Sequence, residues 1–251
     1  EGMKDGLRYP DACNQALQFI LNKEVRTPND LLGLSYVKEV VHHQYPISMH
    51  CIKRTNDYHA KDIEQISSAT SLRIALKQGI DVSHQLPGYE TYKDSHFFTL
   101  EEFYPYLKYL ITFTPLEGLH MIEEGLDDRL YKVNQETYSL EELINSLTSK
   151  RYTRSRIQRM LIHILLHNTK EEMKKAMDID YIHILGLSAS GQRYIKTAKK
   201  NTEYKIITNI TKHKHPALDI EKRGAQLLDL VNPGFFNETI KAIPYRKIDL
   251  K

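Results

Sequence analysis

The sequence predicts an α/β protein: the C-terminal part of a Rossmann-type nucleotide-binding domain, followed by a mainly helical region and a small βαβ unit. Three observations lead to this fold. The first third of the chain alternates helix, short strand and a hydroxyl-rich helix start. Apolar residues at helical spacing dominate the middle of the chain. Two β-prone runs then flank a basic helix near the C-terminal end.

These changes of pattern divide the chain into three expected regions. Residues 1–85 form the later part of the nucleotide-binding domain, residues 86–178 the helical region, and residues 179–251 the small α/β unit and a C-terminal tail. The segment Leu86-Pro-Gly88 marks the first boundary, because proline and glycine interrupt regular structure.

Composition narrows the class of protein. Of the 251 residues, 41% are apolar and 27% charged, as in soluble globular proteins. No apolar run approaches the roughly 20 residues that cross a bilayer, so we expect a cytoplasmic protein without a membrane partner. Cys13 and Cys51 have no cysteine or histidine at metal-ligand spacing, which argues against disulfides and structural zinc. Net charge is only +3, but lysine and arginine are clumped, which favours a polyanionic partner.

The elements of the first region follow from spacing and from helix-start signals. Apolar residues recur at helical intervals in two segments, and Thr27-Pro-Asn-Asp30 begins the second of them. A short alternating segment is typical of a strand. In order, we expect a helix over 9–21, a helix over 31–41, a strand over 46–53, a polar loop over 54–59, and a helix over 71–78 closed by Gly79.

Helices dominate the second region, and the third returns to mixed structure. Several helices have clear start signals, such as the capping box Ser139-Leu-Glu-Glu142. A strand, a basic helix and a second strand make the βαβ unit. We expect helices over 99–112, 116–133, 139–147, 153–166 and 170–177, a strand over 181–187, a helix from 188 to 200, a strand over 204–210, a helix over 216–230, and a polar end from 232.

The stretch from Ile66 to Arg73 is the first candidate site. It begins a helix, where unpaired N–H groups and a partial positive charge favour an anion. Its hydroxyls can donate to phosphate oxygens, and Arg73 can add a charged fork. The same hydroxyls can equally serve as helix caps. The candidate phosphate ligands are Ser67, Ser68, Thr70 and Arg73.

A basic helix is the second candidate. Residues 150–160 carry five positive charges and no acid, and Ile157 and Met160 predict which face turns inward. The outward arginines could follow the phosphate backbone of RNA, with Tyr152 stacking on a base. A solvated face or an internal ion-pair network is the alternative reading. The candidate RNA ligands are Arg151, Arg154, Arg156 and Arg159, and lysines 196, 199, 200, 212 and 214 add to the positive charge nearer the C-terminal end.

Histidines and nucleophiles give no further site. His42 and His43 end a helix, where the dipole favours a positive charge. His213 and His215 have strand-type metal spacing but no evident third ligand, so we assign no metal to protein side chains. No triad of serine or cysteine with histidine can be defended from one sequence.

Four separate stretches together resemble one family, the bacterial tRNA(Met) cytidine acetate ligases, which are nucleotidyltransferase-like. The resemblance implies an enzyme that uses ATP, with Mg²⁺ carried by the nucleotide, and acetate to make acetyl-adenylate. It implies acetyl transfer to N4 of the wobble cytidine of elongator tRNA(Met). The matching stretches are residues 27–37, 66–73, 150–160 and 215–219.

The resemblance also implies which residues contact ATP. The family's asparagine in a Pro-Asn segment and its arginine after a short strand fall on Asn29 and Arg54. The side-chain amide of Asn29 can both donate to and accept from the edge of the nucleoside. The guanidinium of Arg54 can stabilise the negative charge that builds up on the phosphates as pyrophosphate departs. Ser67, Ser68, Thr70 and Arg73 would complete the phosphate site. No protein nucleophile is needed, and we name no catalytic residue in this chain.

One departure from the family pattern affects the expected activity. The family's Gly-rich stretch with paired histidines is absent from these 251 residues. We therefore expect a truncated form that is inactive in adenylate formation alone. Two other functions stay open: a non-catalytic RNA-binding module, and an adenylyltransferase acting on a small metabolite.

Overall fold

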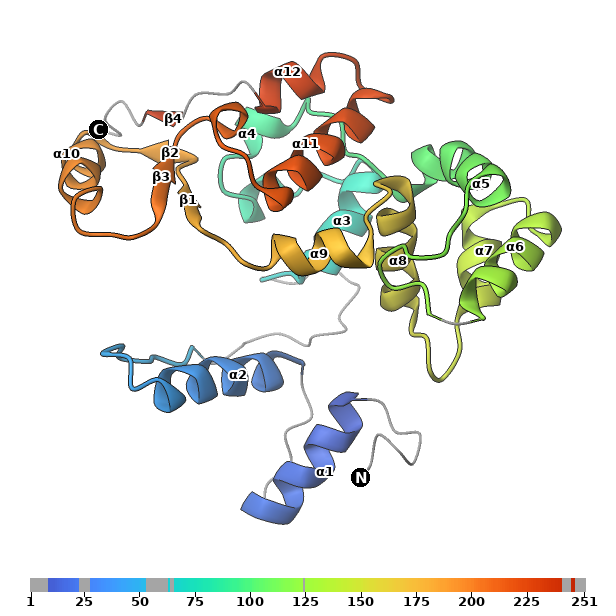
Figure 1. The fold of residues 1–251 in the computed structure, drawn as a ribbon, viewed down its shortest axis with the longest axis horizontal. Coiled ribbons are helices and arrows are strands. Elements are labelled where there is room, and N and C mark those ends of the chain that lie inside the picture. Colours follow the sequence, from blue (N-terminus) through green and yellow to red (C-terminus); the bar gives the residue numbers. More distant parts are fainter. Residues whose placement is uncertain are drawn as a thin grey trace. The chain divides into compact units, whose positions relative to one another are not determined.

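The computed structural model describes residues 9–22, 28–52, 63, 66–123, 125–240 and 245–246. The chain forms two compact units, Glu1–Ser95 and His96–Lys251, which are described separately (Figure 1). The division into three regions expected from the sequence stays a prediction.

Helices make up the regular structure of the described part of the first unit. Three expected helices are confirmed, and the third ends as its glycine predicts. Gly79 has φ +70°, and the N–H of Ile80 donates to the carbonyl of Ala75 at 2.9 Å, which closes a Schellman motif. The helices are α1 (Tyr9–Leu21), α2 (Pro28–His42), α3 (Ala69–Lys77) and α4 (Tyr89–Tyr92), with a 3₁₀ turn over Ser83–Gln85.

The prediction of a strand over 46–53 is wrong for residues 46–52, the part of this segment that the structure describes. Residues 46–52 have no β-assignment, and Lys53 lies outside the described residues. Ile47 and Met49, which the alternation would place on one face of a strand, are 58% and 43% exposed. Alternation supplies the side-chain pattern of a strand, but a strand also needs a second backbone to accept its hydrogen bonds.

Four helices of the second unit enclose its main core. They are α5 (Tyr104–Phe113, after a 3₁₀ turn over Leu100–Phe103), α6 (Leu126–Glu136), α7 (Leu140–Leu147) and α8 (Arg154–Leu165). Helix α5 packs against α6 and α8, and α7 packs against α6 and α8 (Figure 1). The fully buried centre includes Leu107, Ile111, Leu130, Leu143 and Leu161.

The helix expected over 116–133 is wrong in its first half. Residues 115–123 form an irregular loop, and α6 begins only at Leu126. The loop buries three apolar side chains that lie three residues apart, Leu116, Leu119 and Ile122. This spacing also occurs on the buried face of a helix, which explains the wrong prediction. Gly118 and Gly125 adopt positive φ angles of +81° and +77°, which a continuous helix does not allow.

The C-terminal part of the second unit contains the predicted βαβ unit. Strands β1 (Tyr181–His183) and β3 (Lys205–Ile207) pair in parallel on either side of α10 (Ala189–Ala198) in sequence. A second parallel pair, which periodicity did not predict, joins β2 (Gly186–Leu187) to β4 (Tyr245–Arg246). The remaining helices are α9 (Lys170–Ala176), α11 (Pro216–Asp229) and α12 (Phe235–Ile240), with a 3₁₀ turn over Ile210–Lys212.

Arg223 joins this part to the helical core. Its guanidinium donates to Glu172 at 2.6 Å, to the side-chain oxygen of Asn168 at 2.8 Å, and to the carbonyl of Leu166 at 3.0 Å. One side chain of α11 thus satisfies three acceptors at the turn between α8 and α9. Among the helices that the structure describes, none is long and apolar enough to span a bilayer.

We expect Arg223→Met to lower the free energy of unfolding by about 1–3 kcal/mol, because it leaves charged and backbone acceptors without their donor. Arg193→Met on the exposed face of α10 is the matched control, expected to stay within about 0.5 kcal/mol of the unsubstituted chain. Urea denaturation followed by circular dichroism measures both. Equal stability of the two variants would contradict the role given to Arg223.

Candidate functional site

The hydroxyl-rich start of α3 is partly a structural cap. The hydroxyl of Ser68 accepts from the backbone N–H of Ser71 at 3.1 Å, and the hydroxyl of Ser71 donates to the carbonyl of Ser68 at 2.8 Å. Both side chains are buried, at 4% and 1% exposure. Ser68 therefore holds the helix start rather than presenting its hydroxyl to solvent.

The opposite side of the same start is open. Thr70 and Arg73 are exposed and three residues apart, so they share one face of α3. Across the described residues, no acceptor is found for the backbone N–H groups of Ala69 and Thr70. A hydroxyl, a guanidinium and two helix-start N–H groups together suit an anion such as a phosphate.

Ser67 connects this start to a distant part of the same unit. Its backbone N–H donates to the side-chain oxygen of Gln85 at 2.8 Å. Gln85 belongs to the 3₁₀ turn, 18 residues further along the chain. Sequence reasoning missed this residue because nothing in its local pattern distinguishes it from other glutamines.

The other two predicted ATP ligands are not joined to α3 in the described structure. Asn29 is exposed near the start of α2, and no hydrogen bond within the described ranges links it to residues 66–73. Arg54 lies outside the described residues. The roles of Asn29 and Arg54 therefore stay predictions.

Helix α8 turns the predicted face inward and uses its arginines in ion pairs. Ile157, Met160, Leu161, Ile164 and Leu165 are all buried, as expected. Arg154 donates to both carboxylate oxygens of Glu141, at 2.9 and 2.5 Å, and to Asn145 at 3.1 Å. Both Nη groups of Arg154, which would otherwise be available to hold a phosphate, are thus occupied by the carboxylate of Glu141.

Glu123 organises a second cluster on the same helix. Its carboxylate accepts from Arg156, from the hydroxyl of Tyr152 at 3.1 Å and from Arg151 at 3.4 Å. The guanidinium of Arg156 also lies 4.8 Å from the ring centre of Tyr152, within cation–π range. Burial raises the pKa of Glu123, but the Tyr152 hydrogen bond and the charge of Arg156 outweigh it, so that the net pKa is lowered.

These contacts bear on the two readings that the basic helix left open. Three of its candidate RNA ligands, Arg151, Arg154 and Arg156, form ion pairs with acids from other parts of the second unit. Arg159 donates to the carbonyl of Ser155 at 3.3 Å and has no acidic partner in the described ranges. The ion-pair network is thus present, and RNA binding by this helix stays a prediction.

Histidines at the start of α11 have structural partners. His215 is buried, its Nδ1 accepts from the N–H of Ala217 at 3.1 Å, and its Nε2 therefore donates to the carbonyl of Asp178 at 2.8 Å. His213 lies 3.0 Å from Asp180. No group of three metal-ligating side chains occurs within the described ranges.

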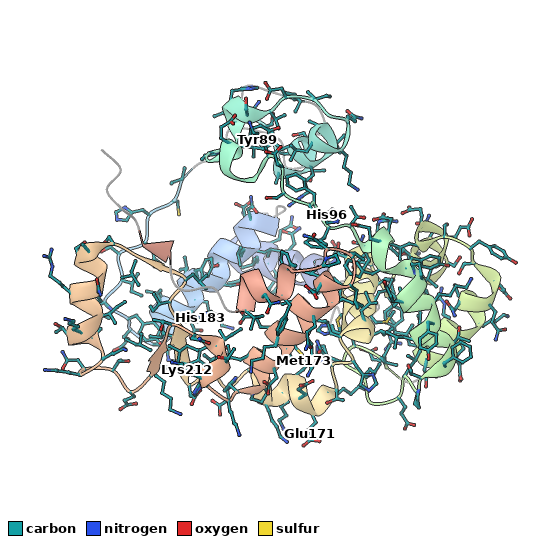
Figure 2. All side chains as sticks on the ribbon, turned by 90° about the horizontal axis from the view of Figure 1, so that it is seen from above. Tyr89, His96, Glu171, Met173, His183 and Lys212 are labelled. Atoms are coloured by element: carbon teal, nitrogen blue, oxygen red, sulfur yellow. The ribbon has the colours of Figure 1, made fainter. Side chains whose placement is uncertain are left out.

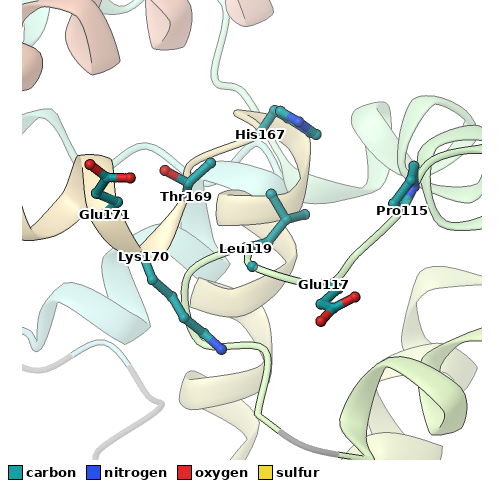
Figure 3. Close-up of a pocket in the computed structure, with 8 residues that line it drawn as sticks. Pro115, Glu117, Leu119, His167, Thr169, Lys170 and Glu171 are labelled. Atoms are coloured by element: carbon teal, nitrogen blue, oxygen red, sulfur yellow. The ribbon is translucent and has the colours of Figure 1, made fainter.

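The described residues of each unit line a hollow. The larger, of about 470 Å³, lies beside the turn before α9 (Figure 3). The smaller, of about 310 Å³, lies beside the C-terminal end of α3. Neither is lined by a residue predicted to contact ATP or RNA. The larger is lined by Pro115, Glu117, Gly118, Leu119, His167, Thr169, Lys170 and Glu171.

Comparison with known proteins places the chain in a family. Residues 1–241 match the family model described as HIGH Nucleotidyl Transferase. The chain belongs to the HIGH nucleotidyl transferase family. It is also similar to proteins named tRNA(Met) cytidine acetate ligase, with 34% identity over 90% of the chain for that of Geobacillus sp. (strain WCH70) and 32% over 92% for that of Bacillus subtilis (strain 168). In both comparisons the chain spans 61% of the relative's length.

Solved structures show the same fold. The crystal structure of apo Thermotoga maritima TmcAL (form I) aligns with a TM-score of 0.78 at 21% identity, covering 97% of this chain and 68% of that chain. TmcAL bound with alpha-thio ATP (form II) aligns with a TM-score of 0.74. The nucleotidyltransferase-like α/β fold and the family resemblance predicted from the sequence are confirmed.

The Glu123 cluster predicts a pH dependence of stability. A glutamate whose pKa is lowered by folding stabilises the folded state above its ordinary pKa, and that contribution is lost as the pH falls through the lowered value. We expect Glu123→Gln to cost about 1 kcal/mol at pH 7 and less at pH values below the ordinary glutamate pKa of about 4.3.

Denaturant titrations between pH 7 and pH 3 measure this difference. Glu136→Gln, an exposed glutamate of α6 without an ion pair in the described ranges, is the control, and its stability should follow that of the unsubstituted chain at each pH. A constant gap between Glu123→Gln and the unsubstituted chain would contradict the ion-pair role of the cluster.

Proposed function

We propose that this chain belongs to an ATP-dependent tRNA(Met) cytidine acetate ligase. Similarity to curated enzymes of that name along about nine tenths of the chain carries the proposal. A fold shared with a protein crystallised with alpha-thio ATP supports the nucleotide as substrate. The open anion site at the start of α3 supplies the matching chemistry in this chain.

The proposed reaction has two steps. An acetate oxygen attacks the α-phosphorus of ATP, the bond from that phosphorus to the bridging oxygen breaks, and pyrophosphate leaves with acetyl-adenylate formed. The N4 amine of the wobble cytidine in elongator tRNA(Met) then attacks the acetyl carbon. AMP leaves, and the amine gives up a proton.

Charge neutralisation is the contribution of this chain's residues to the first step. Thr70, Arg73 and the free N–H groups at the α3 start would hold phosphate oxygens, with Mg²⁺ entering on the nucleotide. Ser68 would act through the helix start that it caps, and Ser67 through its neighbouring backbone. Asn29 would contact the nucleoside, and Arg54 the departing pyrophosphate.

Arg73→Gln tests the phosphate site. We expect it to weaken ATP binding about 10-fold or more, since a charge-assisted hydrogen bond contributes about 1.5–3 kcal/mol. Lys77→Gln is the matched control, because Lys77 lies one turn further along the same face of α3, is exposed and carries the same charge. Isothermal titration with ATP and with pyrophosphate measures both variants.

The outcomes of that titration separate the functions. Loss of ATP and pyrophosphate affinity in Arg73→Gln alone supports the ligase. An equal, small loss in both variants would mean that only overall charge matters and that α3 is a packed helix of a non-catalytic RNA-binding module.

A second prediction concerns the complete reaction. The protein that contains these 251 residues is expected to exchange pyrophosphate into ATP only when acetate is present. With unmodified elongator tRNA(Met), it should produce N4-acetylcytidine, detected by mass spectrometry of digested nucleosides.

Arg54→Ala in that protein should abolish exchange while leaving tRNA affinity unchanged. Undiminished exchange in Arg54→Ala would contradict the role proposed for Arg54. ATP consumption that needs a different small metabolite in place of acetate would identify an adenylyltransferase instead.

A further inference from the structure

We infer that the exposed basic surface formed by Arg193 and Lys196 of α10 and by Lys200 in the turn after it holds the phosphate backbone of the RNA substrate. This inference rests on the proposed function, because it states where that substrate is held. It moves the principal RNA contact away from α8, the helix that sequence composition favoured.

Helix α10 lies in a segment that carries positive charge without compensation. Between Tyr181 and Thr202 the sequence has no aspartate or glutamate, while α10 and the two residues after it contain Arg193, Lys196, Lys199 and Lys200. A cluster of one sign attracts a polyanion at long range and neutralises its charges on contact.

The cations gather on the face turned away from the protein. Residues 191, 195 and 198 are the less exposed positions of the helix and lie at i, i+4 and i+7, so they define its inner face against β2. Arg193 and Lys196 follow at i and i+3 on the opposite face, and Lys200 lies in the turn two residues beyond the end of α10. All three are exposed.

The three cations lack acidic partners in the part of the chain that the structure describes. No salt bridge or side-chain hydrogen bond within the described ranges involves Arg193, Lys196 or Lys200. The arginines of α8 differ, since Arg154 and Arg156 must first break pairs with Glu141 and Glu123 to meet a phosphate. Binding at α10 therefore avoids a cost that binding at α8 would carry.

An aromatic side chain beside the cations favours RNA over other polyanions. Tyr194 is 72% exposed and follows Arg193 directly. An exposed ring next to a cationic row can stack on an unpaired base, which neither a phospholipid surface nor an acidic protein presents. An anticodon loop offers such bases.

The place of α10 in the second unit leaves room for a large partner. Figure 1 shows α10 at the edge of that unit, on the far side of β2 and β3 from α11 and away from the bundle of α5 to α8. Figure 2 shows side chains projecting outward along this end. A tRNA lying along α10 would not need to displace the helical core.

The test compares charge removal on the two helices in the 251-residue chain. One variant combines Arg193→Gln, Lys196→Gln and Lys200→Gln. Its matched control combines Arg151→Gln, Arg154→Gln and Arg159→Gln, which removes the same charge from α8 and the turn before it. Fluorescence anisotropy with labelled, unmodified elongator tRNA(Met) measures affinity across potassium chloride concentrations, and circular dichroism confirms that each variant folds.

We expect the α10 variant to bind tRNA about 10-fold or more weakly and to reduce the slope of log affinity against log salt by about 2, as the loss of roughly three phosphate contacts requires. The α8 variant should change affinity less than about 2-fold and keep the slope. A reduced slope in the α8 variant with no change in the α10 variant would overturn the inference.

Two further outcomes distinguish a failure of this inference from a failure of the proposed function on which it rests. If the folded chain does not bind tRNA at all, the RNA part of the proposed function fails as well. If it binds tRNA and the α10 variant is unchanged, only the present inference fails. Vesicles containing phosphatidylserine are the second probe. If the chain binds them through α10 and the α10 variant still binds tRNA normally, α10 contacts a membrane surface and the RNA-binding inference is overturned.

Discussion

The first N–H groups of every helix need acceptors, and this requirement shapes much of the molecule. In the part of the chain that the structure describes, five helices meet it in the same way, with a hydroxyl that accepts from the N–H three residues later. The same chemistry that binds a phosphate at a helix start therefore also closes ordinary helix starts. Ser68 belongs to this group, so the site at α3 is defined by Thr70 and Arg73, which the cap leaves open. The five capping residues are Ser68, Ser139, Thr153, Thr169 and Ser188.

Charge acts differently on the two basic helices because their surroundings differ. On α8, acids brought from α7 and from the loop before α6 neutralise the arginines and fix them in place. On α10, the neighbouring sequence carries no acid and the lysines stay solvated. Ion pairs of partly exposed groups add little stability, but they do decide which cations remain available to a partner.

Local signals predicted the helices well and the longer-range contacts poorly. Caps and apolar spacing predicted α1, α7 and α8, because both signals act within a few residues. The strand over 46–53 failed because pairing depends on a second backbone, and the helix over 116–133 failed because buried loop residues reproduced its spacing. Local pattern placed the hydroxyls at the start of α3, and their contact with phosphate stays a prediction. It did not point to Gln85 near α3, or to Glu123 and Glu141 near α8, since their partners are set by the fold.

The βαβ unit leaves and rejoins the rest of its unit at almost one point. Helix α9 packs against α11, and His215 at the start of α11 bonds back to Asp178 just after α9. Residues 179–214 therefore form a segment whose two ends are held close together by the contacts between α9 and α11. The entropic cost of bringing the two ends of such a segment together changes slowly with its length. Insertions or substitutions within it therefore need not disturb the bundle of α5 to α8. The segment 179–214, which carries α10, can therefore differ in length and charge between relatives, provided that β2 keeps its pairing with β4, while the bundle of α5 to α8 stays the same.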